Sequence, residues 1–211
     1  MKRARILLAD DHPLTLEGVR RVLESDYEIV GAVTDGRALL EAAESLKPDL
    51  IVLDIAMPLL NGIDAGRQIR AILPHTKLLF VTMYESPAFL EAVIEAGGNG
   101  YVLKSAVGEE LLEAVEAVLH GEFYLSPQLS TTGRPASQNQ PGSFVAPRLS
   151  IREREILQLI AEGKLAKEIA FILHISVKTV AFHRENIKTK LGVRSTAELT
   201  KRALEQGLIA L

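Results

Sequence analysis

The sequence predicts an α/β protein with a doubly wound (βα)5 domain, followed by a small all-α domain that contains a helix-turn-helix. Over the first 120 residues, short apolar runs alternate with amphipathic stretches that have the period of a helix. A small, polar stretch rich in Pro and Gly then interrupts this alternation, and from residue 150 onward only helical patterns occur. Five strand–helix repeats in this order imply a parallel sheet with helices on both faces.

The clearest strand is Leu50-Ile51-Val52-Leu53-Asp54, in which four apolar residues lead into one carboxylate before a Met57-Pro58 break. Continuous apolar runs of this length are typical of strands that are buried on both faces of a parallel sheet. The predicted strands are residues 5–9, 28–33, 50–54, 77–82 and 100–104, and the predicted helices are residues 13–24, 37–46, 63–73, 88–96 and 109–119. Right-handed crossovers leave few ways to wind these repeats, and we expect the strand order 2-1-3-4-5.

A flexible linker is predicted at residues 122–147, between a first domain at 1–121 and a second at 148–211. The segment 131–143 is small and polar, is punctuated by Pro and Gly, and carries a single charge. Such a segment buries too little apolar surface to offset the entropy that it would lose on ordering.

Four helices are expected after the linker. Ser150 and Ser195 each begin a capping-box pattern, and Gly163 and Gly192 stand where helices should end. The helices should therefore span about residues 151–161, 165–173, 177–191 and 196–206.

The composition excludes several kinds of site. The chain has no Cys, so it forms neither disulfides nor thiolate metal sites, and its five His residues show no HxxxH or HExxH spacing. No apolar run reaches the roughly 18 residues that a membrane span needs. The apolar run after the basic first residues is too short for a signal peptide, so we expect a cytoplasmic protein.

The net charge of −3 hides a division along the chain. Residues 1–147 carry 12 Lys and Arg against 20 Asp and Glu, a net charge of −8, whereas residues 148–211 carry 12 against 7, a net charge of +5. An acidic first part and a basic last part indicate separate partners, and nucleic acid is the expected partner of the basic part.

Three carboxylates are predicted to meet at the carboxyl ends of neighbouring strands. Asp10 and Asp11 follow the first strand and Asp54 follows the third, and these strands are adjacent in the expected order. Without compensation the charges would repel one another, and the pKa of at least one carboxyl group should rise. A hard dication held by carboxylate and carbonyl oxygens would relieve the repulsion, and Mg²⁺ is the usual ion in such a site.

Thr82 and Lys104 end the fourth and fifth predicted strands and should reach the same edge. A hydroxyl and an ammonium beside a carboxylate and a metal ion form a receptor for a tetrahedral dianion, so Asp54 is expected to attack phosphorus and become an acyl phosphate. Each residue also has an ordinary explanation: Asp10 or Asp11 could cap a helix, Thr82 could fill a strand, and Lys104 could be solvated. Their joint placement at strand ends favours the phosphoryl site.

Residues 1–120 resemble the receiver domain of two-component response regulators. The matching motifs are Ala9-Asp10-Asp11-His12, Asp54-Ile55-Ala56-Met57-Pro58, Asn61-Gly62, Thr82 and Gly100-Tyr101-Val102-Leu103-Lys104, with Lys104-Ser105 where many receivers have Lys-Pro. The resemblance implies that Asp54 is the phosphoacceptor, that a sensor histidine kinase phosphorylates it, and that Lys104 and Thr82 bind the phosphoryl group. It also implies a switch pair of Thr82 and Tyr101. The implied Mg²⁺ site consists of Asp11, Asp54 and the carbonyl of Ala56, with Asp10 in support.

The helices predicted at 165–173 and 177–191 are separated by a tight turn, which is a helix-turn-helix pattern. In the second helix Val180, Ile187 and Leu191 share a face that we expect to be buried, and Phe182 lies on the opposite face. An ordinary helical hairpin is the alternative. The clustered Lys and Arg residues, and an aromatic residue without a burial role, favour a helix that enters the major groove of DNA.

Residues 148–211 resemble the LuxR-type DNA-binding domain, and together with the receiver they resemble the NarL/FixJ subfamily. The match includes Leu149-Ser150-Ile151-Arg152-Glu153-Arg154-Glu155, Lys167-Glu168-Ile169-Ala170, Ile175-Ser176-Val177-Lys178-Thr179-Val180, Lys190-Leu191-Gly192 and Ala197-Glu198-Leu199. The resemblance implies base contacts from Ala181, Phe182 and Glu185, and phosphate contacts from Lys178, Thr179, His183, Lys188 and Lys190. The last helix is expected to pair with its copy in a second subunit.

The base-reading positions depart from the pattern of many relatives, which carry Lys at one or both of the positions held here by Ala181 and Glu185. The operator sequence therefore does not transfer from those relatives. A Glu side chain can accept a hydrogen bond from the amino group of cytosine, and Phe182 could pack on a thymine methyl group.

The sequence thus predicts a transcription regulator that binds promoter DNA, as a dimer, under the control of phosphorylation, with no enzymatic activity beyond its own phosphoryl transfer and dephosphorylation. One alternative is a phosphohydrolase with an Asp nucleophile. Such enzymes typically have a second carboxylate at the position of Ala56, and they need a substrate cap for which 120 residues leave little room. The other alternative is a receiver that acts as a phosphate-independent interaction module.

Overall fold

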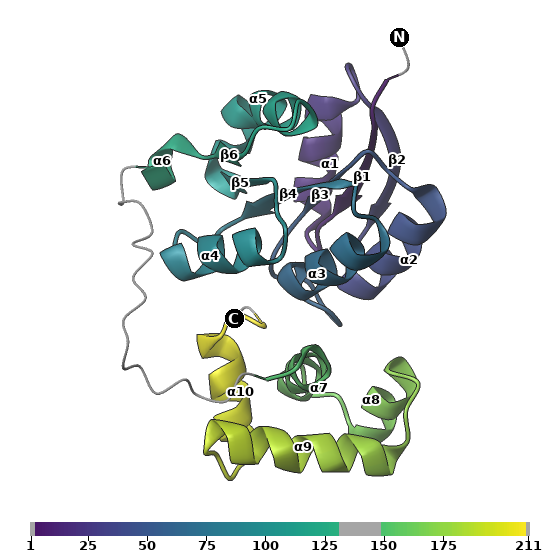
Figure 1. Ribbon diagram of the computed structural model, residues 1–211, viewed down its shortest axis with the longest axis vertical. Coiled ribbons are helices and arrows are strands. Elements are labelled where there is room, and N and C mark those ends of the chain that lie inside the picture. Colours follow the sequence, from purple (N-terminus) through teal and green to yellow (C-terminus); the bar gives the residue numbers. More distant parts are fainter. Residues whose placement is uncertain (1–2, 131–148, 210–211) are drawn as a thin grey trace. The chain divides into compact units, whose positions relative to one another are not determined.

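A computed structural model describes residues 3–130 and 149–209 (Figure 1). The chain divides into two compact units, one N-terminal and one C-terminal. Within the described ranges, none of the helices combines the length and the apolar character that crossing a membrane requires.

The described part of the N-terminal unit is a six-stranded parallel sheet with helices on both faces (Figure 1). The strands are β1 (Arg5–Ala9), β2 (Glu28–Val33), β3 (Leu50–Leu53), β4 (Lys77–Thr82), β5 (Gly100–Leu103) and β6 (Tyr124–Leu125), in the order β2-β1-β3-β4-β5-β6. The helices are α1 (Pro13–Leu23), α2 (Gly36–Leu46), α3 (Gly62–Ile72), α4 (Pro87–Glu95), the 3-10 helix η1 (Lys104–Ala106), α5 (Val107–Leu119) and α6 (Pro127–Ser130). Helices α1 and α5 cover one face, and α2, α3 and α4 cover the other. The predicted doubly wound fold and the order of its first five strands are confirmed.

Strand β3 lies between β1 and β4, and all four of its side chains are buried. An unbroken apolar strand is stable here because helices cover both faces of the sheet. Val52, for example, is paired with Leu8 on one side and with Leu79 on the other. The apolar run ends with the strand, so Asp54 stands at the carboxyl edge of the sheet.

A sixth strand and a further helix occupy residues that the sequence analysis assigned to the linker. Strand β6 pairs in parallel with β5, and just beyond it the N–H of Ser126 donates to the carbonyl of Tyr101 at 2.9 Å. The Ser126 hydroxyl is fully buried and donates to a carboxylate oxygen of Glu110 on α5. The linker prediction was therefore wrong for residues 122–130, because a two-residue strand leaves no periodic pattern. Residues 131–147 of the predicted linker lie outside the described residues.

The C-terminal unit consists, in its described part, of α7 (Ile151–Ala161), α8 (Ala166–Ile172), α9 (Val177–Leu191) and α10 (Thr196–Glu205), close to the predicted bounds. The capping box at Ser150 is confirmed, because its hydroxyl accepts the N–H of Glu153 and the Glu153 carboxylate accepts the N–H of Ser150. Gly163 and Gly192 follow the ends of α7 and α9 with φ angles of +81° and +65°. The helices enclose a common core that includes Ile156, Leu157, Leu159, Ile169, Val180, Ile187, Leu199 and Ala203.

Candidate functional site

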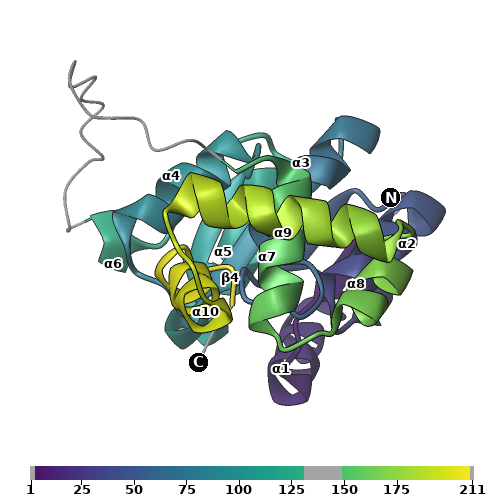
Figure 2. The same cartoon turned by 90° about the horizontal axis from the view of Figure 1, so that it is seen from below.

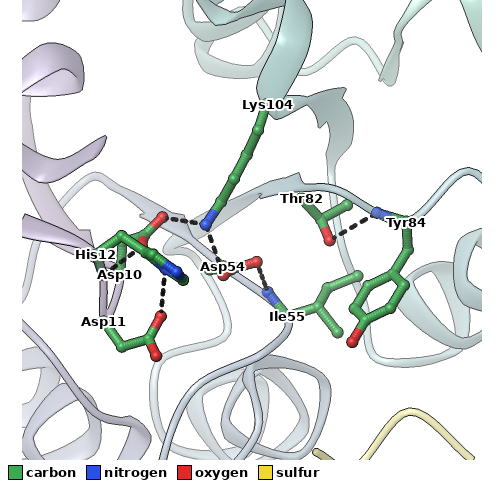
Figure 3. A network of polar contacts seen from close by, with 8 residues as sticks. All are labelled: Asp10, Asp11, His12, Asp54, Ile55, Thr82, Tyr84 and Lys104. Carbon is green, nitrogen blue, oxygen red and sulfur yellow. Dashed lines mark hydrogen bonds and ion pairs between the residues drawn. The ribbon is translucent and has the colours of Figure 1, made fainter. Parts of the chain in front are cut away.

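The carboxyl ends of β1, β3 and β5 bring charged side chains into one pocket (Figure 3). Asp10 and Asp11 follow β1, Asp54 follows β3, and Lys104 begins η1 directly after β5. Nζ of Lys104 lies 2.7 Å from Oδ2 of Asp10 and 2.7 Å from Oδ2 of Asp54. The three side chains in these two ion pairs are each at most 10% exposed. The structure therefore brings together the lysine and two of the carboxylates that the sequence analysis placed at this edge.

Burial dominates the electrostatics of this pocket. Burial raises the pKa of Asp54, and the negative charge of Asp10 raises it further. The ammonium of Lys104 and the backbone N–H of Ala56 lower this pKa, but they do not cancel the effect of burial. Burial alone would lower the pKa of Lys104, but its hydrogen bonds to Asp10 and Asp54 outweigh that effect and the pKa is raised. The pKa of Asp54 is thus raised, as expected for one of the crowded carboxyl groups, but the main cause is burial and the repulsion from Asp10 contributes less.

The loop that carries Asp54 is held against the start of α3. Asn61 caps α3 by accepting the N–H of Asp64 at 2.9 Å, and the N–H of Gly62 donates to the carbonyl of Ile55 at 2.8 Å. A Cβ atom at residue 62 would lie 1.9 Å from the carbonyl oxygen of Asp54. Gly62 is therefore required for this close approach of the two backbones. The sequence shows the Asn-Gly turn but not this role, which arises from tertiary packing.

Asp11 and His12 form the open side of the pocket. One ligand atom from each of Asp10, Asp11, His12 and Asp54 lies within 4.8 Å of the others. Oδ1 of Asp11 is shielded from solvent and accepts no hydrogen bond from any described residue, although Nδ1 of His12 is 2.7 Å away. A buried carboxylate oxygen without a hydrogen-bond donor, among further carboxylates, fits a divalent cation such as Mg²⁺. The role of the Ala56 carbonyl stays a prediction.

Thr82 and Tyr101, the predicted switch pair, are joined through the backbone of Tyr84. The N–H of Tyr84 donates to Oγ1 of Thr82 at 3.3 Å, and the hydroxyl of Tyr101 donates to the carbonyl of Tyr84 at 2.7 Å. Thr82 and Tyr101 are fully buried, and burial raises the pKa of Tyr101, with further contributions from Asp54 and Tyr84. The ring of Tyr84 stacks on Phe89 with centroids 4.1 Å apart. Tyr84 was not predicted from the sequence because its backbone, not its side chain, makes the connection.

Helix α9 lies across α7 in the C-terminal unit (Figure 2). One side of α9 is buried and the opposite side is polar and exposed. Val180 and Ile187 are buried as predicted, and Leu191 is partly buried against the same core. Phe182 is 63% exposed, so packing within the described residues does not account for an aromatic side chain there. Of the other predicted DNA contacts, Lys178, Ala181 and Glu185 are exposed, and Thr179, His183, Lys188 and Lys190 are partly exposed.

Two lysines that were expected to contact phosphates are paired within the protein. Nζ of Lys190 lies 2.7 Å from Oε2 of Glu153, and Nζ of Lys188 lies 2.9 Å from Oε1 of Glu185. Burial would raise the pKa of Glu153, but the hydrogen bonds from Lys190 and Ser150 lower it. The ion pair between Lys190 and Glu153 connects the end of α9 to the capping box at the start of α7. Phosphate contact by either lysine would require it to share or exchange its carboxylate partner.

Known protein families match both units. Residues 6–116 match the response regulator receiver domain, and residues 147–203 match the bacterial regulatory proteins of the luxR family. The chain is similar to oxygen regulatory protein NreC of Staphylococcus carnosus, with 37% identity in an alignment that covers 97% of this chain and 99% of NreC. It is also 36% identical to transcriptional regulatory protein MctR of Rhizobium johnstonii, over 99% of this chain and 96% of MctR.

Solved structures of the RcsB response regulator are similar over the whole length. One structure, from Salmonella typhimurium, has 30% identity and a TM-score of 0.65 and covers 98% of this chain and 99% of RcsB. Another contains two RcsB dimers bound to two parallel DNAs, with 30% identity, a TM-score of 0.59 and coverage of 97% and 99%.

Proposed function

Because the chain belongs to the response regulators and joins a receiver domain to a LuxR-type DNA-binding domain, we propose that phosphorylation of Asp54 controls how it binds promoter DNA. The observation that carries this proposal is the pocket in which one ammonium, that of Lys104, contacts the carboxylates of Asp54 and Asp10 at 2.7 Å each. The phosphoryl donor that fits the family is the phosphohistidine of a sensor histidine kinase.

The chemistry proposed at Asp54 is an in-line displacement at phosphorus. A carboxylate oxygen of Asp54 forms the new P–O bond while the P–N bond to the kinase imidazole breaks, and the leaving imidazole takes a proton from solvent. Lys104 already touches the nucleophile, so it can follow the charge onto the phosphoryl oxygens. Mg²⁺, held by Asp11, Asp54 and the Ala56 carbonyl with Asp10 in support, would supply further charge stabilisation. Water reverses the modification by attacking the acyl phosphate, and no other enzymatic activity is proposed.

The proposed switch begins where the phosphoryl group would meet Thr82. The phosphoryl group carries about 1.5 to 2 negative charges near neutral pH, and it replaces the single negative charge of the Asp54 carboxylate. Thr82 accepts the N–H of Tyr84, so its hydroxyl hydrogen can be donated to a phosphoryl oxygen. A shift of Thr82 and Tyr84 changes what the Tyr101 hydroxyl contacts, because that hydroxyl donates to the Tyr84 carbonyl. The two arrangements would form the bistable element that phosphorylation biases.

Helix α9 is the proposed recognition helix. Ala181, Phe182 and Glu185 would contact base edges, which suits their exposed positions, while the hydroxyl, imidazole and ammonium groups around them would contact phosphates. The latter residues are Lys178, Thr179, His183, Lys188 and Lys190. RcsB dimers have been seen on DNA, so we propose that this chain also binds as a homodimer, in the cytoplasm, with α10 pairing across the two-fold axis.

Labelling the full chain with radioactive acetyl phosphate, and then measuring its DNA binding, tests the proposal. Asp54→Asn should abolish labelling and any gain in DNA affinity, whereas Asp26→Asn, a change at an exposed carboxylate, should behave as wild type. Labelling that persists in Asp54→Asn would place the nucleophile elsewhere. Labelling that leaves binding to selected DNA unchanged would favour the phosphate-independent module, and sustained turnover of aryl phosphates would favour a phosphohydrolase.

A further inference from the structure

The ring of His12 is turned toward the carboxylates of the pocket (Figure 3). Its Nδ1 atom lies 2.7 Å from Oδ1 of Asp11 and 3.2 Å from Oδ1 of Asp10. His12 is the N-cap residue of α1, yet in the described structure its side chain makes no capping hydrogen bond. A hydrogen bond between Nδ1 and Oδ1 of Asp10, and not helix capping, directs the ring toward the pocket.

The closest contact of the ring is not a satisfied hydrogen bond. Oδ1 of Asp11 is shielded from solvent and has no hydrogen-bond donor among the described residues, so the 2.7 Å approach of Nδ1 is poorly aligned. Oδ1 of Asp11 and Nδ1 of His12 lie close together without a hydrogen bond between them, so one cation can bind both atoms as ligands. The His12 side chain is 65% exposed, so its ring can turn toward an ion without disturbing the core.

We propose that His12 supplies a nitrogen ligand to a metal ion in this pocket, and that the pocket thereby favours Mn²⁺, Co²⁺ and Ni²⁺ more strongly than an all-oxygen site would. Mg²⁺ is hard and prefers oxygen, whereas the first-row transition ions accept imidazole well. Ligand atoms of Asp10, Asp11, His12 and Asp54 lie within 4.8 Å of one another, which a single ion can span after small side-chain movements. The inference rests on the proposed function, since it takes Asp11 and Asp54 as the metal site.

Titration calorimetry of the full chain with Mg²⁺, Mn²⁺ and Ni²⁺, each used alone, measures this selectivity. His12→Asn should weaken Ni²⁺ and Mn²⁺ binding by about tenfold or more, in the range found when a group around a metal site is lost, and should change Mg²⁺ binding by less than about twofold. His75→Asn is the matched control, because His75 is an exposed histidine in the loop before β4 and should leave binding of all three ions unchanged.

Pulsed electron paramagnetic resonance of bound Mn²⁺ gives a second readout. A ¹⁴N coupling from imidazole should be present in the wild type and absent in His12→Asn. Equal losses for all three ions, or a wild-type spectrum without nitrogen coupling, would overturn the assignment of His12. Asp11→Asn separates the two proposals: if it abolishes binding of every ion while His12→Asn changes nothing, only the His12 inference fails. A wild-type chain that binds none of the ions would refute the metal pocket and His12 together.

Discussion

Substituting Gly62 with Ala should displace the loop that carries the phosphoacceptor. The added Cβ would lie 1.9 Å from the carbonyl oxygen of Asp54, about 1.5 Å short of the 3.4 Å at which ordinary contact begins. The atoms in the way are backbone, and hydrogen bonds of 2.8 Å from Asp54 to Ala9 and from Gly62 to Ile55 hold them in place. Overpacking of this kind costs about 1–3 kcal/mol of stability. A misplacement of about 1 Å can lower a reaction rate on the order of 100-fold, so phosphorylation should slow by roughly that factor.

The assay is the initial rate of labelling by acetyl phosphate, with urea unfolding followed in parallel. Gly18→Ala is the matched control, because Gly18 is exposed on α1 and an added Cβ there would meet nothing within 4 Å. This control should label at the wild-type rate and be more stable by up to about 1 kcal/mol, since Ala favours a helix over Gly. If Gly62→Ala labelled as fast as wild type at wild-type stability, the close approach would not position Asp54, and the steric argument would be refuted.

Two further predictions concern the DNA-binding domain. Glu153→Gln should lower the free energy of unfolding by about 1–3 kcal/mol at neutral pH, because the charged partner of Lys190 is lost from a site where the Glu153 side chain is 5% exposed. The pKa of Glu153 in the folded protein is lowered below its ordinary value, so the carboxylate stabilises the fold above the unfolded-state pKa and this stabilisation is lost as the pH falls through the folded-state pKa. Urea unfolding of both proteins across this range should show the difference shrinking in acid, and a difference independent of pH would contradict the charged pair. Phe182→Ala should weaken binding to a selected operator more than binding to random DNA, because Phe182 is proposed to contact a thymine methyl group. Fluorescence anisotropy measures both affinities, and equal losses would reduce Phe182 to a general packing role.

The fold was predictable wherever an element buries a long, regular surface. The run Leu50–Leu53 is apolar throughout because both faces of β3 are covered, and that pattern is visible in the sequence. Strand β6 was not predictable, because it has two residues and is fixed by contacts that the sequence does not display. Its neighbour Ser126 donates its backbone N–H to Tyr101 and its hydroxyl to Glu110.

The site was predictable to the extent that it follows from strand ends. Parallel strands share a carboxyl edge, so the meeting of Asp10, Asp54 and Lys104 follows from the topology. The orientation of the His12 ring depends on a side-chain torsion angle and on its neighbours, and the sequence carries no signal for it. The pairing of Lys190 with Glu153 likewise joins two helices across 37 residues of sequence, so a pattern read along one helix could not reveal it.

The hydrogen bonds around Tyr84 indicate which contact of the proposed switch would change first. The N–H of Tyr84 donates to Oγ1 of Thr82 at 3.3 Å, and the hydroxyl of Tyr101 donates to the carbonyl of Tyr84 at 2.7 Å. The N–H of Ser126 donates to the carbonyl of Tyr101 at 2.9 Å. The longest, and therefore weakest, of these hydrogen bonds is the one nearest Asp54. A phosphoryl group that draws Thr82 away would lengthen that bond at the smallest cost and displace the Tyr84 backbone, and the two shorter hydrogen bonds would pass the shift to β5 and β6. A covalent change at one strand end can thus reach the last described strand of the receiver without unfolding any part of the sheet.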